Sequence, residues 1–170
     1  DHTLDRTTNA REVWGGKDIA LDSRTAAELR TLETGLWFDP PQQGVRLPLL
    51  SEAVAAIQEG GVTLIERKGG DAAACVGLLR RADRINHVVV QSFDWDYLRD
   101  FHALEPRQIL GALGPPGSRD GQKLTDEEKT LDAAWIESIR QLGAKVIVWN
   151  RQVDREAVAV AHGRGLAVWV

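Results

Sequence analysis

The chain has 170 residues, with 21 Lys and Arg against 25 Asp and Glu, and its formal net charge is −4 at pH 7. This balance argues against a nucleic-acid-binding protein, because no basic stripe is available to neutralise phosphates. With 43% hydrophobic and 27% charged residues, the composition is typical of a globular protein and argues against disorder. No apolar run approaches the roughly 20 residues that cross a bilayer. We therefore expect a soluble protein without a transmembrane segment, in the cytoplasm in preference to the periplasm or the cell exterior.

The first sixty residues are irregular, with signals for two short helices. A capping-box pattern at 25–28 predicts a helix toward residue 32. Pro48 precedes a second helix, which we expect to be capped by Ser51 and to run to about residue 58. The loop between them contains Trp37 and Phe38. A loop of this length is usually functional or a linker, and its two aromatic residues favour a function.

From about residue 62 onward, apolar strand-like runs alternate with helical stretches. The predicted strands are 62–68, 86–92, 108–113, 145–149 and 166–170. The predicted helices are 72–82, 95–104, 126–142 and 154–162, with Asp71 and Asp94 as caps of the first two and Gly143 ending the third. Strand-helix-strand units of this spacing predict parallel strands that are covered on both faces.

Two α/β architectures fit this alternation, an open doubly wound sheet and a closed barrel. A (β/α)8 barrel typically has about 250 residues, so five strands do not close one. If the barrel is right, strands are missing from both ends. The single cysteine, Cys75, lies in an Ala-rich helical stretch, and we expect an inert packed thiol.

A carboxylate and an ammonium group stand two residues apart near the end of the first predicted strand. Because strand side chains alternate, Glu66 and Lys68 point to one side and Arg67 to the other. Ligands of parallel sheets bind at the carboxyl ends of the strands. The two groups could hold a divalent cation and a phosphate oxygen. The simpler interpretation is a mutual salt bridge, and the spacing alone favours it.

Weaker candidates follow other strands. Ser92 and Phe93 offer a hydroxyl and an aromatic ring, although alone they are typical of a helix cap and a packing residue. Trp169 could form an apolar wall for a ligand, although an aromatic residue in such a run more often belongs to the core. The histidines and the cysteine show no metal-ligand spacing, and no Ser, His and acid combination suggests a catalytic triad.

One ordered series of short segments runs through nearly the whole chain. It opens with Asp-His-Thr-Leu-Asp-Arg-Thr-Thr-Asn at 1–9 and continues at 25–38, 46–52, 64–68, 91–93 and 165–170. The series resembles the glycerophosphodiester phosphodiesterase family, a barrel of the phosphatidylinositol-phosphodiesterase-like superfamily. Each segment is a weak signal by itself, but their order is specific.

The resemblance implies a (β/α)8 TIM-type barrel, present here as an incomplete piece with about five parallel strands. It implies a single domain over 1–170 that lacks its N-terminal strands and its C-terminal end. It also implies an enzyme of glycerol and lipid metabolism, which hydrolyses small-molecule glycerophosphodiesters to glycerol 3-phosphate and an alcohol with Mg²⁺ or Ca²⁺. Glu66 matches one of three metal-binding carboxylates, and Lys68 matches a lysine that neutralises phosphate charge in the transition state. Ser92, Phe93 and Trp169 are then the expected substrate contacts.

The chain departs from the family's pattern in several places. One of two catalytic histidines is expected immediately before Asp1, and the second histidine and two further carboxylates are expected upstream of it; His2 matches neither histidine. Arg67 stands where the family prefers an apolar residue, and we expect it to snorkel to water. Gln91 replaces a commoner Ser.

Two alternatives stay open on the same barrel. One is a lysophospholipase-D-like or phosphoinositide-cleaving enzyme, in which Trp37, Phe38 and Trp95 would cover an acyl chain. The other is a catalytically inactive binding domain, which the missing histidines and carboxylates would suggest. A histidine directly before Asp1 and an earlier Glu-x-Asp would remove the second alternative.

Overall fold

The computed structural model describes residues 3–119, 121–151 and 153–170, with only the backbone of Arg119. Two compact units make up the chain, Asp1–Gly60 and Gly61–Val170. We describe each unit by itself. No helix of the described ranges is long and apolar enough to span a membrane.

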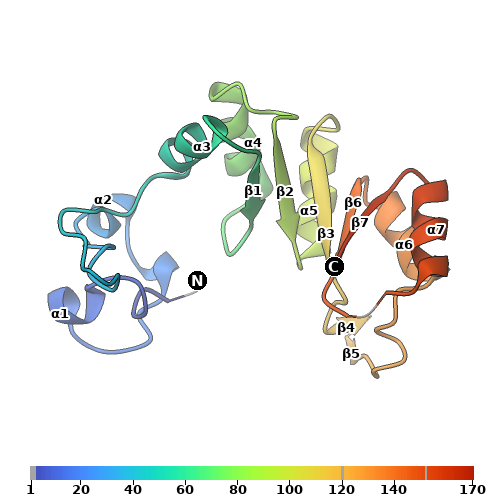
Figure 1. Ribbon diagram of the computed structural model, residues 1–170, viewed down its shortest axis with the longest axis horizontal. Coiled ribbons are helices and arrows are strands. Elements are labelled where there is room, and N and C mark those ends of the chain that lie inside the picture. The colour runs from blue at the N-terminus through green and yellow to red at the C-terminus, as the bar shows by residue number, and fades with distance from the viewer. Residues whose placement is uncertain (1–2, 120, 152) are drawn as a thin grey trace. The chain divides into compact units, whose positions relative to one another are not determined.

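The second unit is built on a parallel sheet of five strands (Figure 1). The strands lie in the order β1-β2-β3-β6-β7. Their bounds are Thr63–Glu66 for β1, Val88–Ser92 for β2, Ile109–Gly114 for β3, Val146–Trp149 for β6 and Ala167–Trp169 for β7. All five predicted strands are confirmed. They were predictable because runs of Val, Ile and Leu between helical stretches are typical of parallel strands.

A helix follows each of the first four strands of this sheet. After β3, a small hairpin comes before the helix. The helices are α4 (Ala72–Arg81), α5 (Trp95–Leu104), α6 (Ala133–Gln141) and α7 (Arg155–Gly163). Each begins directly after an aspartate whose carboxylate accepts a backbone N–H of the first turn, at N···O distances of 2.7 to 3.1 Å. The predicted caps Asp71 and Asp94 are therefore confirmed.

The predicted helix 126–142 is wrong at its beginning. Residues 126–131 form turns, and α6 begins only after Asp132. Two indoles explain the difference: Trp135 Nε1 donates to the carbonyl of Glu128 at 2.8 Å, and Trp149 Nε1 donates to that of Lys129 at 3.0 Å. Trp135 belongs to α6 and Trp149 to β6, and both hold the carbonyls of the preceding loop in a non-helical path. The preceding loop also contains an unpredicted antiparallel hairpin, β4 (Ser118–Arg119) and β5 (Gln122–Lys123).

Three tryptophans pack in series on the helix side of the sheet. The ring centroids of Trp95 and Trp135 lie 5.4 Å apart in an edge-to-face arrangement, and those of Trp135 and Trp149 lie 6.0 Å apart. Gly114 makes room for the last ring, because a Cβ at this position would overlap with the indole of Trp149. The cluster fixes the ends of β3 and β6 against α6.

The first unit consists of short helices around a small core. Its helices are α1 (Ala10–Trp14), the 3-10 helix η1 (Leu21–Ser23), α2 (Ala26–Leu29) and α3 (Leu50–Gln58). The predicted capping box is confirmed, with Thr25 N donating to Glu28 Oε2 at 2.9 Å and Glu28 N to Thr25 Oγ1 at 3.3 Å. The predicted cap Ser51 is wrong. It lies inside α3, and the helix start is held by Leu49 N, which donates to Glu52 Oε2 at 2.8 Å.

Glu105, at the end of α5, is a nearly buried carboxylate with two arginine partners. Its side chain is 4% exposed and accepts hydrogen bonds from Arg80 Nε and Arg107 Nε, both at 3.0 Å. The hydrogen bond from Arg107 is the main cause that lowers the pKa of Glu105 from 4.5 to about 2, with Arg80 adding to it against the effect of burial. The ionised carboxylate therefore ties α4 and α5 together.

This pKa shift predicts a pH-dependent stability. Because the pKa is lower in the folded than in the unfolded chain, Glu105 stabilises the fold above about pH 4.5, and the effect is lost as the pH falls toward 2. Glu105→Gln should lower the urea midpoint at neutral pH, and its difference from wild type should shrink through this range. The matched control is Glu59→Gln at an exposed position. A difference that stays constant from neutral to acidic pH would contradict this role.

Candidate functional site

Strand register decides which side chains share a face of the sheet. Glu66 pairs with Gln91, Gln91 with Gly111, and Gly111 with Val146. Paired residues of parallel strands point to the same side, and residues two apart along a strand do likewise. One face therefore carries Glu66 and Gln91 in neighbouring positions, and we call it the Glu66 face. The residues between them along each strand point to the helices.

Glu66 and Lys68 come together on the Glu66 face at the end of β1. Lys68 Nζ donates to Glu66 Oε1 in an ion pair, and the two side chains are 35% and 34% exposed. The structure thus has the mutual salt bridge that the spacing alone favours. Both groups are accessible to a ligand, and they are not separated onto opposite faces. An ion pair of this exposure is worth between about 0 and 1 kcal/mol, so a ligand that binds either group displaces it at low cost.

Ser92 does not lie on the Glu66 face, contrary to the expected substrate contact. It follows Gln91 and so points to the helices, where it is 1% exposed. Its Oγ accepts a hydrogen bond from Asp94 N at 3.0 Å, at the start of α5. The hydroxyl is a helix-capping group with no access from the side of Glu66 and Lys68, and we assign it no part in binding.

Arg67 also points to the helix side, but it does not snorkel freely to water. Its guanidinium donates to Asp94 Oδ2 at 2.9 Å and to the carbonyl of Gly70 at 3.1 Å, and lies 4.8 Å from the ring centroid of Tyr97. These contacts connect the end of β1 to the start of α5. Burial raises the pKa of Tyr97 and that of the neighbouring, half-buried Cys75. A raised pKa keeps the thiol protonated, in agreement with an inert cysteine.

Phe93 and Trp169 are exposed, at 48% and 40%, and of the two only Trp169 lies within a strand, on the Glu66 face. Phe93 follows β2, which is the neighbour of β1, and lines a cavity of about 440 Å³ with Trp95, Pro116 and Trp135. Trp169 lies on β7, at the other edge of the sheet. Four strand spacings of about 4.8 Å separate these edges by roughly 19 Å in a flat sheet. Phe93 therefore lines a cavity with Trp95 and Trp135, and Trp169 shares only the face with Glu66 and Lys68.

Gln91 is the residue of this face that sequence reasoning underrated. It is 7% exposed, and its Oε1 has no hydrogen-bond partner among the described residues. The signal was present as a polar residue after a run of three valines, one strand away from Glu66. Its significance depended on the register, which the sequence alone does not show.

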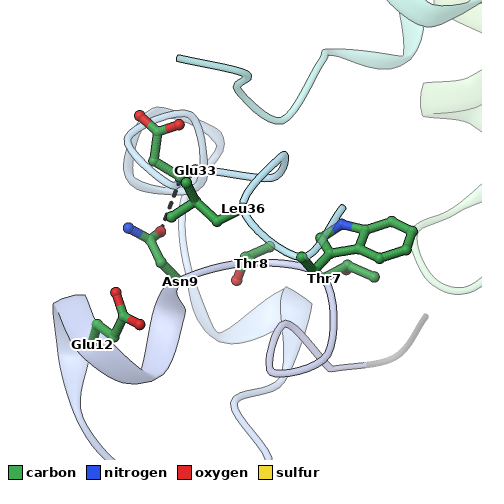
Figure 2. Close-up of a pocket in the computed structure, with 7 residues that line it drawn as sticks. Thr7, Thr8, Asn9, Glu12, Glu33 and Leu36 are labelled. Atoms are coloured by element: carbon green, nitrogen blue, oxygen red, sulfur yellow. Dashed lines mark hydrogen bonds between the residues drawn. The ribbon is translucent and has the colours of Figure 1, made fainter. Parts of the chain in front are cut away.

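The first unit holds a separate pocket beside the opening motif. Figure 2 shows Thr7, Thr8 and Asn9 around a cavity of about 210 Å³ that Glu33 and Leu36 also line. Asn9 Oδ1 accepts a hydrogen bond from Glu33 N at 2.9 Å, and Asn9 N donates to the carbonyl of Glu33 at 3.2 Å. These bonds join the motif to the chain after α2, which is a structural role.

The neighbouring residues of the motif are also used inside the first unit. Asp5 accepts hydrogen bonds from Arg11 Nε at 2.7 Å and from Ile19 N at 2.8 Å, and the bond from Arg11 chiefly lowers the pKa of Asp5. Thr8 Oγ1 donates to the carbonyl of Leu4 at 2.7 Å. Asp1 and His2, which open the motif, lie outside the described residues. The motif as described here shapes a loop and does not present a catalytic group.

The described residues fit a divalent cation only in part. They contain no group of three or more His, Cys, Asp or Glu side chains that could hold a metal ion. Glu66 supplies a single carboxylate. The histidines at 87, 102 and 162 lie before β2, in α5 and in α7, so none of these three stands at the carboxyl end of a strand.

Five parallel strands with intervening helices make this an α/β protein, and similar solved structures assign the fold to the (β/α)8 barrel, of which the chain is a partial piece. No family model matches the chain. A curated relative, "Putative glycerophosphodiester phosphodiesterase YhdW" of Bacillus subtilis, is 26% identical over 167 residues, which cover 88% of this chain and 66% of the relative. The resemblance to the glycerophosphodiester phosphodiesterases is confirmed by this relative, and similar solved structures confirm the fold.

Two of these structures illustrate the match. The putative glycerophosphoryl diester phosphodiesterase of Silicibacter pomeroyi superposes with a TM-score of 0.76 at 22% identity, covering 100% of this chain and 66% of its own. An Oleispira antarctica phosphodiesterase, in complex with the product sn-glycerol-3-phosphate, gives 0.65 at 20% identity, covering 99% of this chain and 72% of its own. At these identities the structures confirm the fold, as an incomplete barrel. The chain spans just under two thirds of YhdW and of the first structure.

The position of Ser92 predicts a purely structural effect of its removal. Ser92→Ala leaves Asp94 N without its acceptor at the start of α5. The free energy of unfolding in urea should fall by about 1 kcal/mol, as for other lost caps. Ser138→Ala on α6, whose hydroxyl bonds only the carbonyl one turn earlier, is the matched control and should change it little. Equal stability of Ser92→Ala and wild type would contradict the capping role.

Proposed function

We propose that the protein with this chain hydrolyses glycerophosphodiesters to glycerol 3-phosphate and an alcohol. The single observation that carries the proposal is the exposed pair of Glu66 and Lys68 at the carboxyl end of β1. The ordered motifs, the similarity to YhdW and the fold of the Oleispira antarctica phosphodiesterase support it. A small anionic ester is the substrate class that suits this pair.

Lys68 is the group that would bind the phosphodiester. Its ammonium carries a full positive charge on a flexible stem, and its present partner is an exposed carboxylate that it can release. As the phosphodiester is attacked, negative charge builds up on the phosphoryl oxygens. A cation that is already in place stabilises this charge more in the transition state than in the bound substrate.

Glu66 would contribute one oxygen ligand to a divalent cation, Mg²⁺ or Ca²⁺, both of which prefer carboxylate oxygens. Such a cation would supply Lewis-acid activation of the phosphate. Because the described residues supply one such carboxylate, we derive no step through the cation. The general acid and base belong, by the resemblance, to two histidines that match no residue of this chain.

A lysophospholipid substrate is the second candidate, and one observation favours it. In the first unit, the rings of Trp37 and Phe38 stack at 4.2 Å while 52% and 49% exposed, which is an apolar surface that an acyl chain could cover. Trp95, in the second unit, has its Nε1 bound to the carbonyl of Leu113 at 2.9 Å and its ring packed on Trp135. Turnover of glycerophosphocholine beside lysophosphatidylcholine separates the two candidates, and turnover of neither would favour an inactive binding domain.

The role of Lys68 predicts a large loss of turnover without a loss of fold. Lys68→Ala should lower kcat on glycerophosphocholine by orders of magnitude, because the charge that stabilises the transition state is removed. Its melting temperature should change little, since the ion pair is exposed. The matched control is Arg67→Ala, one residue away on the opposite face, which should lower stability more than turnover. A Lys68→Ala variant as active as wild type would refute the assignment.

The role of Glu66 predicts weaker cation binding. Glu66→Ala should lower the affinity for Mg²⁺ and Ca²⁺ at least tenfold in calorimetric titrations of the full-length protein, because an anionic oxygen ligand is lost. Glu156→Ala, an exposed carboxylate on α7, serves as the matched control and should bind the cations as wild type does. Unchanged cation affinity and turnover in Glu66→Ala would exclude Glu66 as a ligand.

A further inference from the structure

A buried amide without a partner lies in the middle of the Glu66 face. Gln91 is the register partner of Glu66 on the next strand, and 93% of its surface is covered, since 7% is exposed. Its Oε1 has no hydrogen-bond partner within the described residues. A buried acceptor left unpaired costs about 1 to 3 kcal/mol. The fold therefore carries a cost here that needs an explanation.

The surroundings of Gln91 are built to hold its side chain but give it no partner. Gly111 lies beside it on β3, where an added Cβ would stand 3.2 Å from Gln91 Cβ and 3.7 Å from Oε1. The lack of a side chain at 111 leaves the space that the amide occupies. Apart from Glu66 and Gln91, the strand residues of this face are apolar or glycine: Leu64, Val89, Ile109, Gly111, Leu113, Val146, Val148, Ala167 and Trp169.

A second buried glutamine, Gln108, likewise has an Oε1 without a hydrogen-bond partner among the described residues, but its Nε2 connects two strands. Gln108, at the start of β3, is 2% exposed, and its Nε2 donates to the carbonyls of Val88 at 2.6 Å and Ile109 at 3.1 Å. It connects two strands at the end of the sheet opposite to Glu66. Gln91 lies instead on the strand next to that of the accessible ion pair, with its Oε1 on the side of Gly111. Stability alone would place a leucine at 91, because an apolar side chain has no group to leave unpaired.

We propose that Gln91 binds a hydroxyl of the substrate's glycerol moiety, with Oε1 as the acceptor; this inference rests on the proposed function. A phosphate oxygen has no proton to donate at neutral pH, whereas a glycerol hydroxyl does. The Cα of Lys68 lies two residues, or about 7 Å, nearer the rim than the row of Glu66 and Gln91, and its Nζ reaches back to Glu66 Oε1. A diester whose phosphate takes the place of Glu66 as the partner of Nζ would then extend its glycerol carbons over the neighbouring strand, toward Gln91. The last side-chain torsion of glutamine is soft, so Oε1 can turn toward the open side of the face.

The experiment compares ligands with and without hydroxyl groups. In the full-length protein, Gln91→Leu should weaken glycerol 3-phosphate binding about tenfold relative to inorganic phosphate binding in calorimetric titrations. It should raise KM for glycerophosphocholine by a similar factor, while kcat/KM for bis(4-nitrophenyl) phosphate, which has no hydroxyl, stays within about twofold. Its melting temperature should equal or exceed that of wild type, because an unpaired buried acceptor is removed. Gln108→Leu, the matched control, should lose stability and keep both ratios.

Three outcomes would overturn the inference. They are an unchanged ratio of glycerol 3-phosphate to phosphate affinity in Gln91→Leu, a loss of melting temperature like that of Gln108→Leu, and a wild-type protein that binds glycerol 3-phosphate no better than phosphate. Failure of the proposed function has a different signature, namely a wild-type protein that turns over no glycerophosphodiester. In that case the ratio of the two affinities still decides the role of Gln91.

Discussion

The parity of strand residues is the constraint on which the site depends. In parallel strands held in register, a side chain and its neighbours in sequence point to opposite faces. At the end of β1 this rule sends Glu66 and Lys68 to one face and Arg67 to the other. On β2 it separates Gln91 from Ser92 in the same way. Charged and polar residues that are adjacent in the sequence therefore have different tasks.

The two faces differ in how their polar groups are paired. On the helix side, Arg67, Ser92 and Asp94 form one connected set of hydrogen bonds that fixes the end of β1 against the start of α5. On the Glu66 face, by contrast, the ion pair is a third exposed and Gln91 Oε1 has no partner in the described ranges. Groups that are fully paired stabilise a fold, whereas groups that can exchange partners are available to a ligand. At the ends of β1 and β2, this difference between the two faces is the physical basis for placing the function on the Glu66 face.

The sequence predicted the repeating half of the fold well, because local signals determine it. Apolar runs and aspartate caps indicated all five parallel strands and the starts of α4 and α5. The start of α6 was missed since it depends on the indole of Trp149, twenty residues beyond Lys129. Ser51 was wrong because Glu52 holds the helix start from inside the first turn.

The candidate site was predictable only along a single strand. Glu66 and Lys68 are two apart, so alternation sufficed to place them together. Relating them to residues of β2 required the register, in which Glu66 pairs with Gln91 and not with Ser92. A shift of one residue would exchange the two. The family resemblance pointed to the right segment, at 91–93. It could not show that the hydroxyl of Ser92 faces the helices while the unpaired amide of Gln91 lies on the Glu66 face.

An unpaired amide persists only where the rest of the unit is stable enough to tolerate it. The helix side provides this margin through three tryptophans whose rings pack in series and whose N–H groups are all bound to backbone carbonyls. Such paired aromatic contacts contribute about 0.5 to 1.5 kcal/mol each beyond the burial of their surface. That is the same order as the cost of leaving Gln91 Oε1 without a partner. The rigid side of the sheet thus allows the other side to keep polar groups unsatisfied until a ligand binds.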